Sequence, residues 1–142
     1  MANLFLPENR SLLMAKISSK HTKPEMKVRR FLHARGIRYR LHVKALPGTP
    51  DLVLPKYKTV IQVRGCFWHQ HSCSEGRIPK TRRDFWASKL SRNVERDKEN
   101  DEEVKKLGWS LIVIWECDLK STDKLLNRME QVIKCLSTGQ AN

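Results

Sequence analysis

The sequence predicts a mixed α/β fold in which helices flank a central sheet. Short runs rich in Val, Ile and Leu, typical of strands, occur between residues 37 and 64 and again near residue 112, and stretches with helical periodicity precede, separate and follow them. This order of elements usually builds one sheet covered by helices. Because 142 residues suffice for one hydrophobic core but not comfortably for two, we expect a single domain over residues 1–142.

Residues 1–20 are polar and basic and are expected to form an N-terminal arm, so that the core spans residues 21–142. The first helix should begin near Thr22, because Thr22 and Glu25 have the spacing of a capping box and a proline occupies the first turn. Its apolar face is formed by Val28, Phe31 and Leu32. A glycine commonly ends a helix, so Gly36 should be the end of this one.

Three strands are predicted next, at residues 37–43, 51–54 and 59–64. The first alternates polar and apolar residues as a half-exposed strand does, and the other two are more apolar. Segments that contain proline, glycine or both, at residues 46–50 and 55–58, predict the turns between them.

The remaining chain should contribute two helices and one strand. A long charged helix is predicted over residues 85–107 and ends at Gly108. Residues 109–116 form an apolar run that predicts a buried strand, and a final helix is expected near residues 122–136.

The chain is strongly basic, with 28 Lys and Arg against 15 Asp and Glu, a formal net charge of +13 and a pI near 10.0. Such a charge indicates a polyanionic partner, and nucleic acid is favoured over a membrane surface because no amphipathic membrane helix is evident. Neither a signal peptide nor an apolar run of roughly 20 residues is apparent. We therefore expect a cytoplasmic protein that does not enter membranes.

Residues 65–73 contain two cysteines, two histidines and two large aromatic residues. Thiolate and imidazole are ligands that zinc prefers, so three corners of a tetrahedral site can come from Cys66, His71 and Cys73. Cys117, at the end of the last predicted strand, is the natural fourth ligand. Thiols stay reduced in the cytoplasm, which favours a metal over disulfides. The alternative is that these cysteines are buried thiols without a metal.

Asp51 follows a turn and opens an apolar strand, so its carboxylate should stand at a strand tip. A carboxylate at such a place can hold Mg²⁺, which prefers oxygen ligands and keeps several waters that can serve as nucleophile. An aspartate that caps its own turn is the alternative.

Pro50 and Asp51, followed by Gln62, Val63 and Arg64, form a pattern similar to the Pro-Asp…(Asp/Glu)-x-Lys motif of a group of nucleases, with glutamine and arginine where the second acid and the lysine usually stand. Over about residues 10–119, the chain closely resembles the very-short-patch repair endonucleases, called Vsr. The residues that carry this resemblance are Arg10-Ser11, Met14, Thr22, Glu25, Leu46-Pro47-Gly48, Pro50-Asp51, Gly65-Cys66-Phe67-Trp68-His69, His71, Cys73, Phe85-Trp86, Asn93-Val94-Glu95-Arg96-Asp97, Gly108-Trp109 and Trp115-Glu116-Cys117.

The resemblance implies a restriction-endonuclease-like core with a structural zinc. It implies a Mg²⁺-dependent endonuclease that nicks double-stranded DNA 5′ to the thymine of a T:G mismatch, the product of 5-methylcytosine deamination, and leaves a 5′-phosphate. It also implies a monomer that acts on nucleoid DNA in the bacterial cytoplasm, with mismatch-repair proteins as partners and a companion cytosine methyltransferase.

The resemblance also implies a role for individual residues. The zinc ligands would be Cys66, His71, Cys73 and Cys117, and Mg²⁺ would be held by Asp51 and the backbone carbonyl of Val63. His69 would be the base or proton shuttle, with Asp97 and Asn93 on one helix face beside it and Glu25 near the metal. The residues that would contact DNA are Met14, Phe67, Trp68, Trp86 and Asn93.

Taken without the family, several of these residues have a simpler interpretation. Either histidine could be a hydrogen-bonded structural residue, Trp86 could pack in the core, and Asp97 could belong to a solvated helix face. Glu25 is interpreted first as a helix-capping glutamate.

One departure from the family concerns Val63 and Arg64, because the best-known members carry threonine and histidine there. Arginine keeps its charge and cannot relay protons, but it can stabilise a phosphate. Together with Gln62, this departure leaves two further hypotheses open: a related restriction-type nuclease of different specificity, and a DNA-binding module with weakened catalysis.

Overall fold

The computed structural model describes residues 22–138, and within them four strands form one mixed sheet accompanied by three α-helices. The helices are α2 (Lys23–Ala34), α3 (Arg83–Lys106) and α4 (Thr122–Thr138), and the strands are β1 (Arg40–Leu41), β2 (Leu52–Leu54), β3 (Thr59–Arg64) and β4 (Ser110–Trp115). Short 3₁₀ turns occupy Pro55–Tyr57, Ser74–Gly76 and Glu116–Leu119. The predicted mixed α/β class and the order of its elements are confirmed.

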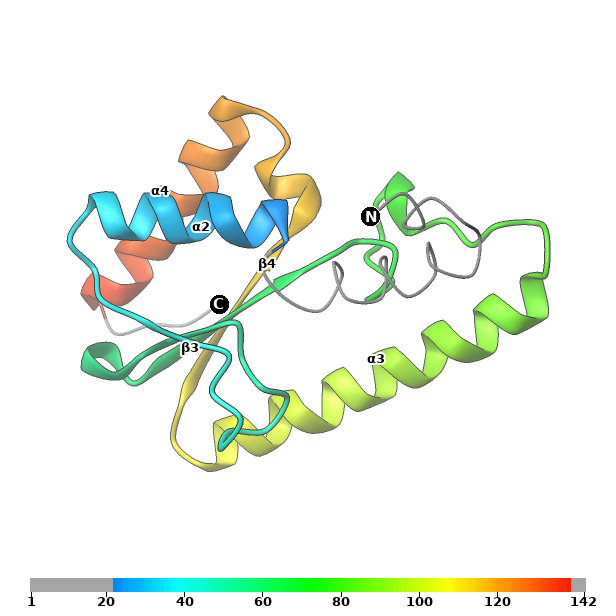
Figure 1. Cartoon of the computed structure of the whole chain (residues 1–142), viewed down its shortest axis with the longest axis horizontal. Coiled ribbons are helices and arrows are strands. Elements are labelled where there is room, and N and C mark those ends of the chain that lie inside the picture. Colours follow the sequence, from blue (N-terminus) through cyan, green and yellow to red (C-terminus); the bar gives the residue numbers. More distant parts are fainter. Residues whose placement is uncertain (1–21, 139–142) are drawn as a thin grey trace, which may run out of the picture.

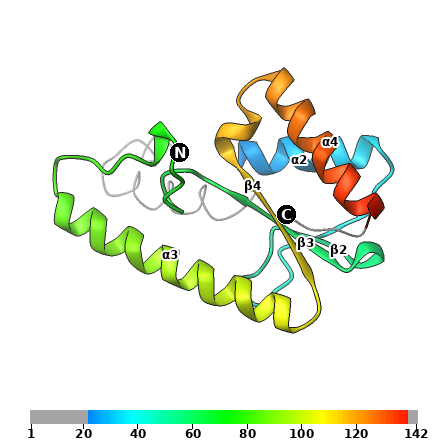
Figure 2. The same ribbon diagram turned by 180° about the vertical axis from the view of Figure 1, so that it is seen from behind.

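The strands lie in the order β1-β2-β3-β4, and only the last pair is parallel. Parallel neighbours need a crossover, which here contains the cysteine-rich loop and α3. Figures 1 and 2 show α2 and α4 together on one side of the strands and α3 on the other. The crossover loop projects beyond the end of β3 and then leads to the first turn of α3 (Figure 1).

Two apolar clusters fill the space on either side of the sheet. The larger one joins the sheet to α2 and α4, and its fully buried members include Val28, Leu32, Leu52, Ile61, Ile112, Ile114 and Met129. The smaller one lies toward α3 and consists of Val53, Val60, Val104 and Leu111. Neighbouring strand residues enter opposite clusters because side chains alternate along a strand. This alternation fixes which strand residues face each helix.

Helix α2 begins as its sequence predicts. The Thr22 hydroxyl accepts a hydrogen bond from the Glu25 N–H at 3.3 Å, and Pro24 lies in the first turn. The Glu25 side chain is itself buried, although carboxylates are rarely buried without a role or a partner. It belongs to the site described below.

The first predicted strand is wrong in extent, because only Arg40 and Leu41 of residues 37–43 pair with β2. His42 has a φ of 46°, a left-handed conformation that an extended strand does not contain. The chain therefore leaves the sheet at His42. The other boundaries differ by one or two residues: α3 starts at Arg83, and α4 continues to Thr138.

The predicted N-terminal arm, including Met14, lies outside the described residues. In the part of the chain that the structure describes, no helix is both long and apolar enough to cross a membrane.

Candidate functional site

Three acid and imidazole side chains from separate elements meet beside β2. Asp51 immediately precedes β2, Glu25 lies in the first turn of α2, and His42 follows β1. The His42 Nε2 lies 3.1 Å from Glu25 Oε1 and 3.9 Å from Asp51 Oδ1. Their ligand atoms all lie within 4.8 Å of one another, which is close enough for one cation to contact all three. The predicted position of Asp51 at a strand tip is confirmed.

Asp51 is held by its neighbouring strand, since its Oδ2 accepts a hydrogen bond from the Val63 N–H at 2.7 Å. Burial raises the pKa of Asp51 from 3.8 to about 6, although this hydrogen bond opposes the rise and the nearby Glu25 adds to it. A carboxylate that is costly to ionise in the folded chain is suited to a cation, because the positive charge offsets the cost.

Glu25 caps its helix only through its backbone, and its carboxylate reaches the cluster instead. The Oε1 atom faces His42, while Oε2 lies 3.4 Å from the Arg29 guanidinium. The interpretation of Glu25 as a capping side chain gives way to that of a carboxylate in the candidate metal shell. His42 is the member that sequence reasoning missed. Its signal was weak, a histidine at a strand end, and only the pairing of β1 with β2 brings it beside Asp51.

His69 and Asp97 form a second acid and imidazole pair, and His69 shares one pocket with Asp51. The His69 Nδ1 lies 2.5 Å from Asp97 Oδ2, so Asp97 on α3 is a partner of His69 and not part of a solvated helix face. The pocket has a volume of about 460 Å³. Its lining includes His42, Asp51, Gln62, Val63, Arg64, Trp68, His69 and Asn93.

Two neighbouring residues have partners other than those the sequence suggests. The Asn93 side chain donates to the Trp68 carbonyl at 3.3 Å, so it supports the loop and not His69. The Arg64 guanidinium forms a 2.6 Å ion pair with Asp101 on α3, and its side chain is largely buried. Its contact with a phosphate stays a prediction.

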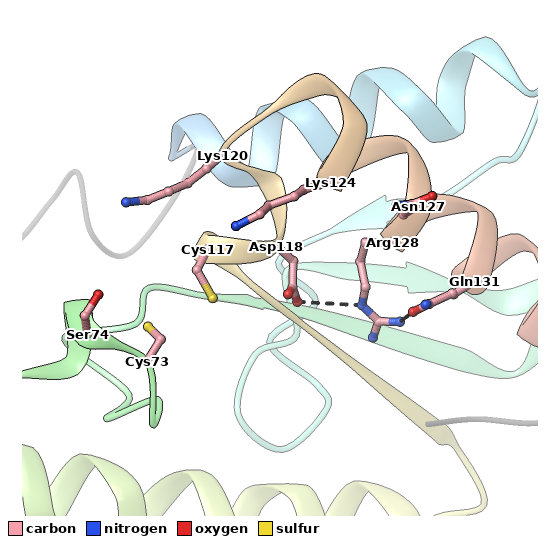
Figure 3. Close-up of a pocket in the computed structure, with 9 residues that line it drawn as sticks. All are labelled: Cys73, Ser74, Cys117, Asp118, Lys120, Lys124, Asn127, Arg128 and Gln131. Carbon is pink, nitrogen blue, oxygen red and sulfur yellow. Dashed lines mark hydrogen bonds and ion pairs between the residues drawn. The ribbon is translucent and has the colours of Figure 1, made fainter.

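The four predicted zinc ligands come together. Ligand atoms of Cys66, His71, Cys73 and Cys117 lie within 4.8 Å of one another. His71 Nδ1 lies 3.4 Å from Cys117 Sγ, and Figure 3 shows the Cys73 and Cys117 sulfurs facing each other from separate segments. A tetrahedral Zn²⁺ with bonds of about 2.0–2.3 Å fits a set of this size after a small contraction. Burial raises the pKa of the Cys66 thiol to about 12, a cost that a bound metal removes by displacing the proton.

The loop that carries these ligands is coiled and not extended. Gln70 between them has a φ of 51°, and its side-chain amide donates to the carbonyls of Phe67 and Gly76 at 2.8 and 2.9 Å. The left-handed residue turns the two imidazoles toward different partners, Asp97 and Cys117.

Gly76 closes the loop by close backbone approach. A Cβ built at Gly76 would lie 2.1 Å from the His71 carbonyl oxygen, so no side chain fits there. The His71 ring stacks on Trp115 with centroids 4.3 Å apart, so this tryptophan at the end of β4 supports the His71 imidazole. Contacts within the protein therefore hold the loop in this conformation without a metal.

An aromatic cluster lies at the junction of this loop and α3. Phe67, Trp68 and Trp86 contact one another edge to face, with ring centroids 5.1 to 6.0 Å apart. All three are half-buried, while Phe85 beside them is 44% exposed. The Lys89 amine lies over both tryptophan rings. Trp86 is therefore not a core residue, and the cluster offers apolar faces next to a positive charge.

A pocket behind the cysteine cluster is lined by Lys120, Lys124 and Arg128 (Figure 3). Arg128 is already engaged, because it lies 3.8 Å from Asp118 and donates to the Val113 carbonyl. The Arg128 contact ties α4 to β4, and the same pocket is also lined by Cys73 and Cys117.

Comparison with known proteins identifies the family of this chain. The family model described as DNA mismatch endonuclease Vsr matches residues 2–75. The chain belongs to the Vsr family. It is 47% identical over 134 residues to a type II nicking enzyme of Neisseria meningitidis serogroup A, covering 94% of this chain and 96% of that protein. Identity to the DNA mismatch endonuclease Vsr of Escherichia coli K12 is 38% over 125 residues, covering 88% and 80%.

A further relative is a type II nicking enzyme of Xanthomonas oryzae, 42% identical over 133 residues that cover 94% of this chain and 98% of the relative. The resemblance predicted from the sequence is therefore confirmed. Membership in the Vsr family makes the chain a DNA mismatch endonuclease, and it accounts for the pocket that His42, Asp51, Trp68 and His69 line together.

Proposed function

We propose that this chain nicks one strand of double-stranded DNA 5′ to the thymine of a T:G mismatch that arises from deamination of 5-methylcytosine, and that it leaves a 5′-phosphate. One observation carries the proposal: in a chain of the Vsr family, Asp51, His69 and Trp68 line one pocket, and Asp97 contacts His69.

A divalent cation is proposed at Asp51, because the carboxylates of Asp51 and Glu25 and the His42 nitrogen form a compact donor set. The Val63 carbonyl is proposed as a further ligand of this cation because the family resemblance implies it. When bound, such a cation supplies neutralisation of phosphate charge and a water of lowered pKa. Zn²⁺ is proposed on Cys66, His71, Cys73 and Cys117, where four protein ligands leave no open position and the role is structural.

The proton step is assigned to His69. Donation of the Nδ1 proton to Asp97 fixes the tautomer, and it leaves the other ring nitrogen, Nε2, free of a proton and able to accept one from the attacking water. Asp97 is thus a positioning residue that acts through His69, as carboxylates beside catalytic imidazoles commonly do. The Asp97 carboxylate also stabilises the imidazolium once it has formed.

Mismatch recognition is assigned to Phe67, Trp68 and Trp86, with Met14 of the N-terminal arm entering from the opposite groove. Aromatic side chains inserted into a duplex unstack a base step at a cost of a few kcal/mol, and the cost is lowest where pairing is already weak. Asn93 contributes by holding the Trp68 backbone.

The remaining parts of the proposal concern the whole chain. Residues 1–142 would be one endonuclease domain with a restriction-endonuclease-like core, which works as a monomer and cooperates with mismatch-repair proteins. The mixed sheet with helices on both sides supports this core.

The test is a nicking assay on duplexes of one sequence that differ only in T:G, T:A or C:G at a single position, with each strand labelled separately. We expect a nick only in the thymine strand of the T:G duplex, with a ligatable 5′-phosphate. Equal nicking of matched duplexes would favour a restriction-type nuclease of other specificity. Binding to the T:G duplex without any nick would favour the weakened DNA-binding module that Gln62 and Arg64 suggest.

A further inference from the structure

His42 has no part in the roles assigned above except as a member of the donor set, yet its surroundings are specific. Its side chain is only 10% exposed, and the carboxylates of Glu25 and Asp51 that face it are 2% and 14% exposed. Carboxylates so close together and so shielded from water repel each other unless a positive charge lies between them.

The arrangement of the oxygens singles out His42 Nε2. Each carboxylate is anchored through one oxygen: Asp51 Oδ2 accepts from the Val63 N–H, and Glu25 Oε2 lies against Arg29. The other oxygen of each carboxylate, Oδ1 or Oε1, is turned toward His42. Around bound metals, contacts of this kind hold the outer oxygen of a carboxylate and so direct its inner oxygen toward the ion.

The separations lie within the range spanned by the ligand positions of one octahedral ion. Bonds of about 2.1 Å place adjacent ligand atoms about 3.0 Å apart and opposite ones about 4.2 Å apart. The observed separations from His42 Nε2 are 3.1 Å and 3.9 Å. An ion between the three groups therefore needs little movement of the side chains.

We propose that His42 is a direct ligand of the catalytic cation, and that this site binds a divalent transition-metal ion such as Mn²⁺ more tightly than Mg²⁺. Mg²⁺ favours oxygen ligands and seldom accepts imidazole, whereas transition-metal ions accept both imidazole and carboxylate. This inference rests on the proposed function, because it assumes that the cluster is the metal site of the nuclease. It goes further by assigning a nitrogen ligand and a metal preference.

The experiment uses the zinc-loaded full chain without DNA and Mn²⁺ as the probe, so that the cysteine site is not available to manganese. Pulsed electron paramagnetic resonance detects a directly bound imidazole by its ¹⁴N modulation, and a titration gives the dissociation constant. We expect wild-type protein to show this modulation, and labelling with ¹⁵N-histidine to alter it. Because neither measurement needs a variant, the result does not depend on the folding of a mutant.

His42→Gln should abolish the ¹⁴N modulation and raise the Mn²⁺ dissociation constant by at least about tenfold, with a smaller change for Mg²⁺ measured by competition. His33→Gln is the matched control, because His33 is an exposed histidine near the end of α2, and it should change neither. Modulation that persists in His42→Gln would mean that another imidazole, such as His69, binds the ion, and it would overturn the proposal.

Two outcomes separate this inference from the proposed function. If wild-type protein binds Mn²⁺ without ¹⁴N modulation but nicks T:G duplexes with Mg²⁺, His42 is only an ion-pair partner of the carboxylates and the proposed function stands. If no divalent cation binds and no duplex is nicked, both fail.

Discussion

The Asp51 carboxylate lowers the stability of the folded, metal-free chain at neutral pH. Its pKa in the folded chain is raised by burial to about 6 from 3.8, so the folded state disfavours the charged carboxylate. Below pH 3.8, both folded and unfolded chains hold the proton and nothing is lost. As the pH rises toward 6, the unfolded chain ionises first, so stability falls and then stays low.

We therefore expect Asp51→Asn to stabilise the metal-free protein, because asparagine keeps an oxygen for the Val63 N–H and carries no charge. The gain should be on the order of 2–3 kcal/mol at pH 8 and smaller at pH 5. Thermal unfolding at the two pH values measures it. The same variant should not nick DNA, while its affinity for duplex stays near that of the wild type. A variant less stable at pH 8 than the wild type would show that Asp51 builds structure instead.

His69 and Asp97 form the second pair that can be tested residue by residue. His69→Gln should lower the nicking rate by roughly 10²- to 10⁴-fold, as expected for lost acid-base catalysis. Asp97→Asn should lower it as well, because the amide no longer selects the productive tautomer. Single-turnover nicking at saturating enzyme measures both effects, and His33→Gln serves as the control. Zinc lost from His69→Gln would mean that His69, and not His71, is the zinc ligand.

At the scale of elements, the loop between β3 and α3 is expected to depend on zinc. Cys117 at the start of the turn after β4 is the only proposed ligand outside this loop, so a metal would tie the loop to the sheet. Cys117→Ser should lose zinc, lower the melting temperature and abolish nicking. Metal analysis and thermal unfolding test this. Cys135→Ser, on the core side of α4, should keep its zinc. A well-folded zinc-free wild type would contradict the expectation.

The aromatic cluster is also a property of two elements, since Phe67 and Trp68 come from the loop and Trp86 from α3. Trp68→Ala should reduce the ratio of T:G to T:A nicking rates more than it reduces affinity for matched duplex, because the aromatic side chains do not insert into a matched duplex. Trp109→Phe, beside the smaller apolar cluster, is the control. An unchanged ratio in Trp68→Ala would place recognition in groove contacts outside this cluster.

For the molecule as a whole, the net charge of +13 should make DNA binding strongly dependent on salt. Each phosphate contact contributes about 0.9 to the slope of log affinity against log salt, because counterions are released. Lys44→Gln and Arg96→Gln, in the lining of the pocket that contains Asp51 and His69, should each lower the slope by about that amount. Lys134→Gln, an exposed change on α4, should leave it unchanged. A slope near zero for the wild type would contradict binding through the phosphate backbone.

The sequence by itself determined the parts that depend on local chemistry. The order of elements followed from periodicity, the start of α2 from Thr22 and its proline, and the cluster of cysteines and histidine from the density of thiols and imidazoles in residues 65–73. Asp51 at a strand tip followed in the same way, because a turn next to an apolar run is a local signal.

Only the tertiary structure decided which side chains contact one another in the site. His42 joins the site because the pairing of β1 with β2 brings its N–H to the Asp51 carbonyl at 3.1 Å, and two strand residues give almost no periodic signal. Arg64 is bound to Asp101, and the Glu25 side chain contacts His42 and not its own helix cap; both contacts join distant parts of the chain. Such distances depend on strand register and helix packing, which residue types and spacing alone do not fix.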